Sequence, residues 1–307
     1  MIYDLIILGG GPAGAAGAVY AARKQLRTLL VTAEFGGQSS VSTEIYNWIG
    51  TETISGSDLA GNLKKHIKAY EGEFLTIKES EIANGITKLN DHFSVSTDKG
   101  SYEAKTALIV TGSSRRKIEA KNADIYENKG LTYCATCDGP LFSGQDVVVI
   151  GGGNAGFESA AQLLAYCKSV TLLHRSAEFR ADEITVNAVL KNPKMKAIKN
   201  LEILEITGDK FVNGIVYKDK ITNEIHTLPV TGIFVEIGQI PNTGFASSLV
   251  MLDENKKIKV DPRTQMTSIE GIWAAGDCTD GLYHQNNIAA GDAVKALENI
   301  YMHLHTK

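Results

Sequence analysis

Two glycine-rich turns of the same pattern, 142 residues apart, constrain the fold of this chain more than any other feature. The first turn, residues 9–14 (GGGPAG), follows an apolar run at 2–8 and precedes a small-residue helical stretch at 15–23. A further strand pattern at 27–32 completes a βαβ unit. Glycines in such a turn allow a tight bend, close approach of a pyrophosphate and close packing of helix on strand. The alternative, a plain glycine-rich loop, would not explain the flanking strands and helix.

An acid near the end of the second strand of such a unit is expected to bind a ribose hydroxyl. Glu34 lies 20 residues past Gly14 and takes this position, although Ala33 shares the strand end, so the assignment depends on the register. The residues predicted to bind the first dinucleotide are Gly9, Gly11, Pro12, Ala13, Gly14 and Glu34.

The second turn, residues 151–156 (GGGNAG), has the same surroundings: a strand pattern at 146–150, a helical stretch at 157–166 and a strand pattern at 169–173. Its predicted cofactor contacts are Gly151, Gly153, Asn154, Ala155 and Gly156. A spacing of 142 residues is about one domain. The sequence therefore predicts an α/β protein with two Rossmann-like dinucleotide-binding domains, and two dinucleotides on one chain indicate electron transfer between them.

Basic residues after the second unit indicate which nucleotide it binds. The strand end that would carry an acid for the NAD ribose has His174 and Arg175 instead, and Arg180 follows. A guanidinium can bind a 2′-phosphate through two hydrogen bonds, so NADPH is favoured. The alternative is that both arginines are solvated surface charges, and NADH would then be used.

The first unit is then predicted to bind FAD, because a flavin can pass two electrons from a hydride to a disulfide. Two later segments support this interpretation: one strand pattern ends at Thr111 and Gly112, and another ends at Gly276 and Asp277. An aspartate ahead of a helical stretch such as 288–300 is often only an N-cap. We favour the flavin interpretation because the segments accompany a glycine turn.

Cys134 and Cys137 form a CxxC motif and are the candidate redox pair. Cysteines with this spacing can form a small disulfide, and the motif lowers a thiol pKa enough to make it nucleophilic. A structural zinc site would need two more ligands, and Cys167 and Cys278 stand alone. Asp138 is adjacent and could protonate a leaving thiolate. The spacing does not order the two thiols; we expect Cys137 to face the flavin and Cys134 to exchange with the substrate.

Charge and hydropathy argue against several other functions. A net charge of −4 over 307 residues lacks the basic excess that binds nucleic acid. No apolar run approaches the ~20 residues that span a bilayer, so no membrane partner is expected. Four cysteines are too few for a disulfide scaffold, and the first residues show no signal-peptide pattern. We therefore expect a cytoplasmic enzyme.

Motifs across nearly the whole chain make it similar to the low-molecular-weight thioredoxin reductases and to the flavoprotein component of alkyl hydroperoxide reductase. They are GGGPAG at 9–14, GGQ at 36–38, YNWIG at 46–50, CATCDGPLF at 134–142, GGGNAG at 151–156, HRSAEFRA at 174–181, GIFVEIGQIPNT at 232–243 and GIWAAGDC at 271–278. The resemblance implies a homodimer with a split FAD-binding domain of three-layer ββα type, at 1–114 and 245–307. The NAD(P)H-binding domain, with its CxxC, would be inserted at 115–244.

The resemblance also implies roles for individual residues. Cys134 and Cys137 match the redox pair of the family and Asp138 its acid. The positions that match FAD contacts of the family are Gly37, Gln38, Asn47, Asp277 and Gln285. The positions that match its NADPH phosphate site are His174, Arg175 and Arg180.

Three departures from the thioredoxin reductase pattern affect the functional prediction. Ser176 replaces the second arginine of the phosphate motif, which weakens the preference for NADPH over NADH. GPLF at 139–142 and the 233–243 stretch are closer to the hydroperoxide reductase flavoprotein, whose usual N-terminal thioredoxin-like extension does not precede the turn here. A separate thioredoxin or glutaredoxin-like protein is therefore expected as the acceptor. His284 precedes Gln285 where arginine or lysine is usual.

The predicted function is that of an NADPH-dependent thioredoxin-disulfide reductase, an FAD enzyme of cell redox homeostasis. The first alternative is an NADH-using reductase of a peroxiredoxin- or glutaredoxin-like carrier. A ferredoxin–NADP reductase-type flavoprotein of the same fold would not need the CxxC. A redox-sensing flavoprotein would bind both nucleotides without turnover.

Overall fold

The computed structural model describes residues 1–42 and 44–306. The chain forms two compact units: unit 1 comprises Met1–Ser114 and Ile240–Lys307, and unit 2 comprises Arg115–Gln239. The chain passes between them through β7 (Ser113–Arg115) and β16 (Gln239–Pro241), which pair as a two-stranded sheet. The second passage lies at Gln239–Ile240, a few residues before the position expected from the sequence.

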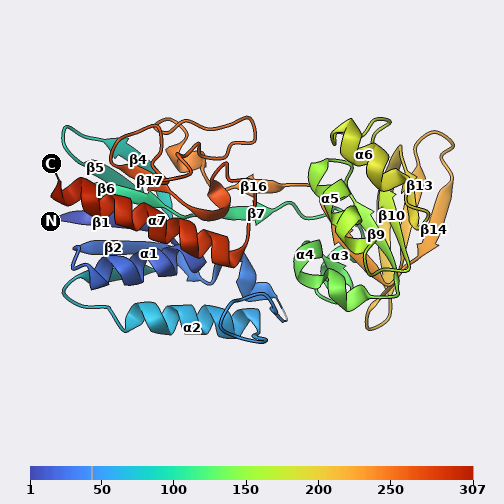
Figure 1. Cartoon of the computed structure of the whole chain (residues 1–307), viewed down its shortest axis with the longest axis horizontal. Helices are drawn as coiled ribbons and strands as arrows, with labels where there is room; N and C mark the ends of the chain where they lie inside the picture. The colour runs from blue at the N-terminus through green and yellow to red at the C-terminus, as the bar shows by residue number, and fades with distance from the viewer. Residues whose placement is uncertain (43, 307) are drawn as a thin grey trace. The chain divides into compact units, whose positions relative to one another are not determined.

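A mostly parallel sheet forms the centre of unit 1 (Figure 1). The strand β1 (Ile2–Gly10) lies between β2 (Thr28–Phe35) and β6 (Ser101–Ile109) and is parallel to both. Farther out, β3 (Leu75–Glu79) pairs with β2, and β17 (Ile272–Ala274) pairs with β6. The antiparallel strands β5 (Phe93–Thr97) and β4 (Ala83–Lys88) extend the sheet beyond β6. Parallel pairing brings the turns after β1 and β6 to the same sheet edge.

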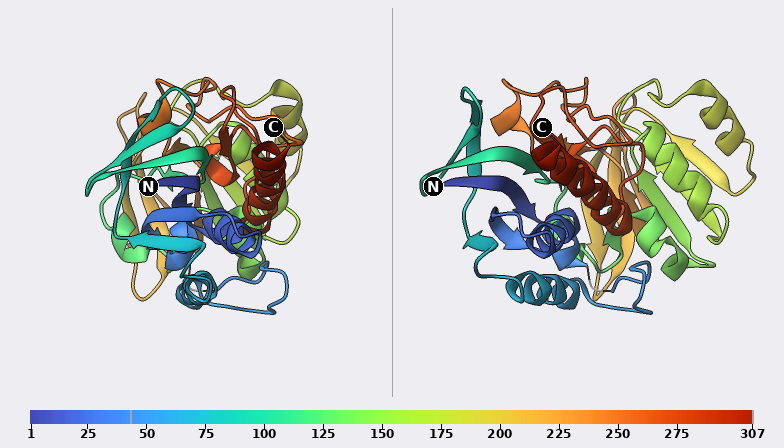
Figure 2. Two further views of the ribbon diagram at one scale, coloured as in Figure 1. Left: turned by 90° about the vertical axis from the view of Figure 1, so that its left-hand side faces the viewer. Right: turned by 60° about the vertical axis from the view of Figure 1, so that its left-hand side comes forward.

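Residues of β1 alternate between two apolar cores, as side chains of a strand alternate between faces. Leu5 and Ile7 pack with the helices α1 (Pro12–Arg23) and α7 (Asn286–His305), which lie beside each other in Figures 1 and 2. Ile6 and Leu8 pack into the opposite core. The remaining helix of this unit is α2 (Gly56–Lys68), and short 3₁₀ turns lie at Gly37–Val41, Gly244–Ala246 and Gly276–Cys278.

Unit 2 is built around a second parallel sheet with the strand order β11-β10-β9-β15-β8. Its strands are β8 (Leu131–Thr132), β9 (Asp146–Ile150), β10 (Ser169–Leu173), β11 (Met195–Ile198) and β15 (Gly232–Val235). A separate antiparallel sheet is formed by β12 (Leu201–Gly208), β13 (Val212–Asp219) and β14 (Ile225–Pro229). The helices are α3 (Ala123–Tyr126), α4 (Ala135–Asp138), α5 (Asn154–Leu163) and α6 (Glu183–Leu190), with a 3₁₀ turn at Gly139–Phe142. Both sheets are Rossmann-like, so the predicted fold class is confirmed.

The helices after the two glycine turns begin three residues earlier than the sequence pattern predicts, at Pro12 and Asn154. The preceding Gly11 and Gly153 have extended backbone and act as N-caps, and proline is favoured at the first helical position. In the part of the chain that the structure describes, no helix is both long and apolar enough to cross a membrane.

Candidate active site and cofactor sites

In the first glycine turn, packing leaves no room for a side chain at Gly9, Gly10 or Gly14, whereas Gly11 is open. Gly9 has φ +123°, and a Cβ there would lie 2.3 Å from the Val110 carbonyl oxygen. A Cβ at Gly14 would lie 2.0 Å from the Gly9 oxygen. At Gly11, by contrast, no atom of the described chain lies within 4 Å of the Cβ position, and no side chain caps α1. The free amides and open space at this helix terminus fit a phosphate.

The second glycine turn repeats this geometry in unit 2. Gly151 has φ +132°, and a Cβ there would lie 2.1 Å from the Glu236 carbonyl oxygen. A Cβ at Gly156 would lie 2.0 Å from the Gly151 oxygen, whereas the Cβ position of Gly153 has no neighbour within 4 Å among the described residues. The amides at the start of α5 likewise have no side-chain cap in this region. The two glycine turns therefore leave open space of the same kind at the start of a helix, which fits a phosphate.

The structure brings two distant segments of unit 1, those of Gly37 and Gly276, to the first glycine turn. A Cβ at Gly37 would lie 3.6 Å from the Gly11 Cα, and a Cβ at Gly276 would lie 3.6 Å from the Ala13 Cβ. The exposed Glu34 lies at the end of β2, beside the same turn. The sequence prediction grouped these residues, and they lie together in the fold.

Thr111 and Gly112 lie immediately beyond β6, against the glycine turn. The Thr111 Oγ1 donates to the Asn242 carbonyl oxygen at 2.7 Å, and the Asn242 Nδ2 donates to the Thr111 oxygen at 3.0 Å. The Thr111 side chain therefore holds the returning segment, and Gly112 supplies a positive φ of +63° to the turn.

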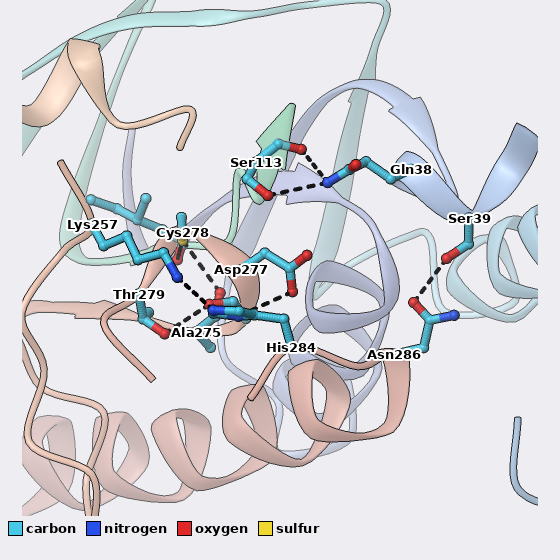
Figure 3. Close-up of polar contacts among 12 residues, drawn as sticks. Gln38, Ser39, Ser113, Lys257, Ala275, Asp277, Cys278, Thr279, His284 and Asn286 are labelled. Atoms are coloured by element: carbon cyan, nitrogen blue, oxygen red, sulfur yellow. Dashed lines mark hydrogen bonds and ion pairs between the residues drawn. The ribbon is translucent and has the colours of Figure 1, made fainter. Parts of the chain in front are cut away.

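Gln38 carries a buried acceptor that no described residue satisfies. Its Nε2 donates to the Ser113 carbonyl oxygen and to the Ser113 Oγ (Figure 3). Its Oε1 is buried and has no hydrogen-bond partner among the described residues. A buried acceptor without a partner costs about 1–3 kcal/mol. An N–H group of a bound ring, such as that of the flavin pyrimidine, would remove this cost, so the residues present fit FAD.

Ser39 and Asn47 form hydrogen bonds with residues at the start of α7. The Asn47 Nδ2 donates to the Gln285 Oε1 at 3.0 Å, and the Asn287 Nδ2 donates to the Asn47 carbonyl oxygen at 2.7 Å. The Ser39 Oγ donates to the Asn286 Oδ1 at 2.8 Å (Figure 3). Asn47 and Gln285, predicted to contact the flavin, are thus brought together at a helix N-terminus, where the helix dipole favours negative charge.

His284 is half-buried and lies between a lysine and an aspartate (Figure 3). The Lys257 Nζ lies 2.6 Å from the His284 Nε2, and the His284 Nδ1 lies 3.6 Å from an oxygen of Asp277. Burial, together with Lys257, lowers the pKa of His284 despite Asp277 and Asp292. Lys257, from a different segment, thus places a positive charge directly beside the histidine at position 284.

Cys134 and Cys137 are joined by a disulfide, with their Cα atoms 5.3 Å apart. Cys134 follows β8, and the Cys137 amide donates to the Cys134 Sγ at 3.1 Å. A hydrogen bond to sulfur favours the thiolate over the thiol. The local geometry thus favours Cys134 as the thiolate after reduction.

Asp138 is placed to hold a proton beside this pair. Burial raises the pKa of Asp138, and the Thr132 Oγ1, which donates to the Asp138 Oδ2, and Arg115 act in the opposite direction. A carboxyl group with a raised pKa is protonated over a wider pH range and is a better general acid near neutrality.

The two remaining cysteines are inert by contrast. Cys167 and Cys278 are 1% and 0% exposed, and burial raises the pKa of Cys278 to about 11.

We expect no fast-reacting thiol in the native oxidised protein, two after denaturation, and four after reduction and denaturation, as measured with DTNB. A fast-reacting thiol in the native protein as purified would show that the Cys134–Cys137 disulfide is not formed in its resting state.

Basic residues gather at the end of β10, beside the second glycine turn. Arg175 and Arg180 are exposed, and the Arg180 amide donates to the Gly152 carbonyl oxygen at 2.8 Å. Lys199, which follows β11, lies 4.3 Å from the centre of the Phe179 ring. Sequence reasoning missed Lys199, although its position just past a parallel strand could have indicated it.

His174 lies beneath this group rather than within its exposed face. Its ring is 6% exposed, and its Nε2 lies 2.9 Å from the Glu178 carbonyl oxygen. A Cβ at Gly152 would lie 2.6 Å from the His174 Nδ1. Burial and the neighbouring basic residues lower the pKa of His174. The neutral ring therefore fixes the loop that carries Arg175 and Arg180.

Comparisons with known proteins agree with this geometry. The profile of the family described as pyridine nucleotide-disulphide oxidoreductase matches residues 3–297. The crystal structure of a thioredoxin reductase from Streptococcus pyogenes MGAS5005 matches with a TM-score of 0.93 and 32% identity, over 100% of this chain and 99% of that one.

Two curated relatives carry other names. A protein named NADH dehydrogenase from Bacillus subtilis (strain 168) is 39% identical over 96% of this chain, and an alkyl hydroperoxide reductase component from Escherichia coli (strain K12) is 37% identical over 96%. The chain spans 57% of the length of each of these relatives.

Proposed function

Because the chain belongs to the pyridine nucleotide-disulphide oxidoreductase family, we propose that it is a thioredoxin-disulfide reductase that uses NADPH and FAD. Proteins of this family bind FAD and NAD(P)H, and the resemblance of this chain to thioredoxin reductases is confirmed by the full-length structural match. The observation that carries the proposal is the Cys134–Cys137 disulfide, with Asp138 beside it, in the same unit as the second glycine turn.

A bound FAD would supply the transfer of two electrons from reduced nicotinamide to the disulfide. In the dithiol state, the Cys134 thiolate attacks one sulfur of the substrate disulfide, and a mixed disulfide forms while the other substrate sulfur leaves as a thiolate. Asp138 supplies the proton to a leaving thiolate. The Cys137 thiolate then attacks the Cys134 sulfur, which releases the second substrate thiol and restores the disulfide. In total, NADPH, one proton and a disulfide yield NADP⁺ and two thiols.

The residues proposed to bind the cofactors follow the two glycine turns. For FAD they are Gly9, Gly11, Pro12, Ala13, Gly14, Glu34, Gly37, Gln38, Asn47, Thr111, Gly112, Gly276, Asp277 and Gln285. For NADPH they are Gly151, Gly153, Asn154, Ala155, Gly156, Arg175 and Arg180, with His174 as a positioning residue. The proposal further includes a homodimer, a cytoplasmic location and a thioredoxin or related small dithiol protein as partner.

The direct test is a steady-state assay of the FAD-loaded protein with NADPH and an oxidised thioredoxin, read at the NADPH absorbance, with DTNB as a second acceptor. Consumption of NADPH that depends on thioredoxin supports the proposal. Lack of reduction of both acceptors, in protein that carries FAD, would refute it.

The preference between NADPH and NADH tests the basic group in unit 2. Arg175→Ala combined with Arg180→Ala is expected to lower kcat/KM for NADPH about 10²–10⁴-fold, because each charged hydrogen bond to a 2′-phosphate contributes about 1.5–3 kcal/mol. The value for NADH should change by less than about threefold. Lys199→Ala should give a smaller shift in the same direction. An equal loss for both nucleotides would show that these residues do not recognise a 2′-phosphate.

A second candidate is an NADH-dependent reductase of a hydroperoxide-reducing carrier. The names of the curated relatives, NADH dehydrogenase and alkyl hydroperoxide reductase, favour it, as does Ser176 in the phosphate motif. A higher kcat/KM with NADH and a peroxiredoxin-type carrier than with NADPH and thioredoxin would select this candidate.

A further inference from the structure

We propose that Glu236 binds the nicotinamide half of the pyridine nucleotide and, as a carboxylate, favours the oxidised, positively charged ring over the reduced, neutral one. The inference deepens the proposed function and rests on it for the identity of the nucleotide. Neither the glycine fingerprint nor the CxxC motif includes Glu236.

The position of Glu236 follows from the strand order of unit 2. From β9 the sheet continues through β10 and β11 on one side and through β15 and β8 on the other, so the order reverses between β9 and β15. Ligands of such sheets bind beyond the carboxyl ends of the strands at this reversal. Val235 pairs with Ile150 at the ends of β15 and β9, and the residues that follow these two strands are Glu236 and Gly151.

The direction of the nucleotide across this edge is set by the charges on the β10 side. Arg175 and Arg180 follow β10, where an adenosine 2′-phosphate would lie, and the glycine turn after β9 would hold the pyrophosphate. The other half of the dinucleotide must then extend over β15. Glu236, the residue directly after β15, therefore meets the nicotinamide half.

The side chain of Glu236 is held in place by a partner from the neighbouring helix. The buried Ser159 of α5 donates from its Oγ to the Glu236 Oε1 at 2.7 Å. The side chain of Glu236 is only half-buried, so it remains open to a ligand on one side. A carboxylate oxygen can accept a hydrogen bond from the N–H₂ of the nicotinamide carboxamide.

The charge of this carboxyl group changes within the physiological pH range. Burial raises the pKa of Glu236 to about 7, with Glu158 acting in the same direction and Ser159 and Arg115 in the opposite one. Above that pH the carboxylate attracts the positive ring of NADP⁺ and has no such attraction for the neutral ring of NADPH. It therefore favours the state in which the hydride has been donated.

Binding of NADP⁺ and of 2′-phospho-ADP-ribose to the oxidised FAD-loaded enzyme tests this directly by calorimetry. The second ligand keeps the 2′-phosphate and the pyrophosphate and lacks only the nicotinamide, so the titration of the phosphates is common to both ligands. We expect the ratio of the two affinities to rise about three- to tenfold from about pH 5.5 to about pH 8.5 in the wild type and to stay constant in Glu236→Gln. Affinity for 2′-phospho-ADP-ribose should be the same in both proteins.

Glu202→Gln is the matched control, because it removes an exposed carboxylate of unit 2 outside this edge and should keep the wild-type pH dependence.

Thermal unfolding checks the fold of Glu236→Gln. The carboxyl has a folded pKa above its unfolded value, so its destabilising effect is absent below about pH 4.5 and grows up to about pH 7. In acid, Glu236→Gln should have the same melting temperature as the wild type. At pH 8 its melting temperature should be higher than that of the wild type.

A ratio in Glu236→Gln that still follows the wild-type pH dependence would overturn the inference and leave the proposed function standing. Wild-type protein that binds neither ligand and reduces no disulfide would overturn the proposed function itself.

Discussion

Cys137→Ser is expected to lower NAD(P)H-dependent reduction of thioredoxin and of DTNB by about 10³-fold or more, because the disulfide that receives the electrons no longer forms. Cys134→Ser should have the same effect through loss of the exchanging thiolate. Both variants should still consume NAD(P)H with ferricyanide, a one-electron acceptor that does not require a dithiol. The measurement is the ratio of the two activities in protein with full FAD content.

The matched control is Cys167→Ala, which removes a thiol of the same unit that is 1% exposed and separate from the disulfide. Truncating this side chain costs some stability but should leave both activities within about twofold of the wild type. Thioredoxin reduction that persists in Cys137→Ser would mean that electrons leave by another route. A ferredoxin reductase-type enzyme would then be the better description.

The two variants also separate the roles of the thiols. The hydrogen bond from the Cys137 amide to the Cys134 Sγ favours Cys134 as the thiolate that attacks the substrate. A mixed disulfide with thioredoxin should therefore accumulate in Cys137→Ser and not in Cys134→Ser, as seen by non-reducing electrophoresis or mass spectrometry. The opposite pattern would reverse the assignment of the two cysteines.

The sequence predicted those parts of the fold that local patterns specify. The glycine turns and their flanking strands follow from short-range periodicity and from the residues that a tight turn requires. The helices after the two turns begin three residues before the predicted positions, because Gly11 and Gly153, which have extended backbone, act as their N-caps. Such displacements are expected where the cap residue is itself part of the motif.

Contacts between distant segments could not be predicted in the same way. The pairing of Asn47 with Gln285, and of Lys257 with His284, depends on how loops of unit 1 meet at the start of α7. No local pattern in the sequence predicts that Lys257 lies beside His284. The same holds for Glu236, since its place beside Gly151 requires the strand order, which the sequence does not contain.

The glycines of the two turns offer the strongest test of cofactor binding that is independent of turnover. Gly153→Ala is expected to weaken NAD(P)H binding about 30-fold, close to 2 kcal/mol, because the new methyl group occupies space left for a pyrophosphate. The fold should be unaffected. The Cβ position has no neighbour within 4 Å in the described chain, and the backbone there has φ −96°. Reduced freedom of the unfolded chain offsets the poorer N-cap, each effect being about 0.5–1 kcal/mol.

Gly151→Ala provides the contrast. Gly151 has φ +132°, and a Cβ there would lie 2.1 Å from the backbone carbonyl oxygen of Glu236. That variant should lose stability as well as binding, whereas Gly291→Ala in α7, also without a neighbour within 4 Å, should lose neither. Gly11→Ala should reproduce the Gly153→Ala result for FAD in place of NAD(P)H. The decisive readings are nucleotide affinity, FAD content and melting temperature for each variant. Unchanged affinities in Gly153→Ala and Gly11→Ala would mean that the open spaces at the two turns do not hold the pyrophosphates.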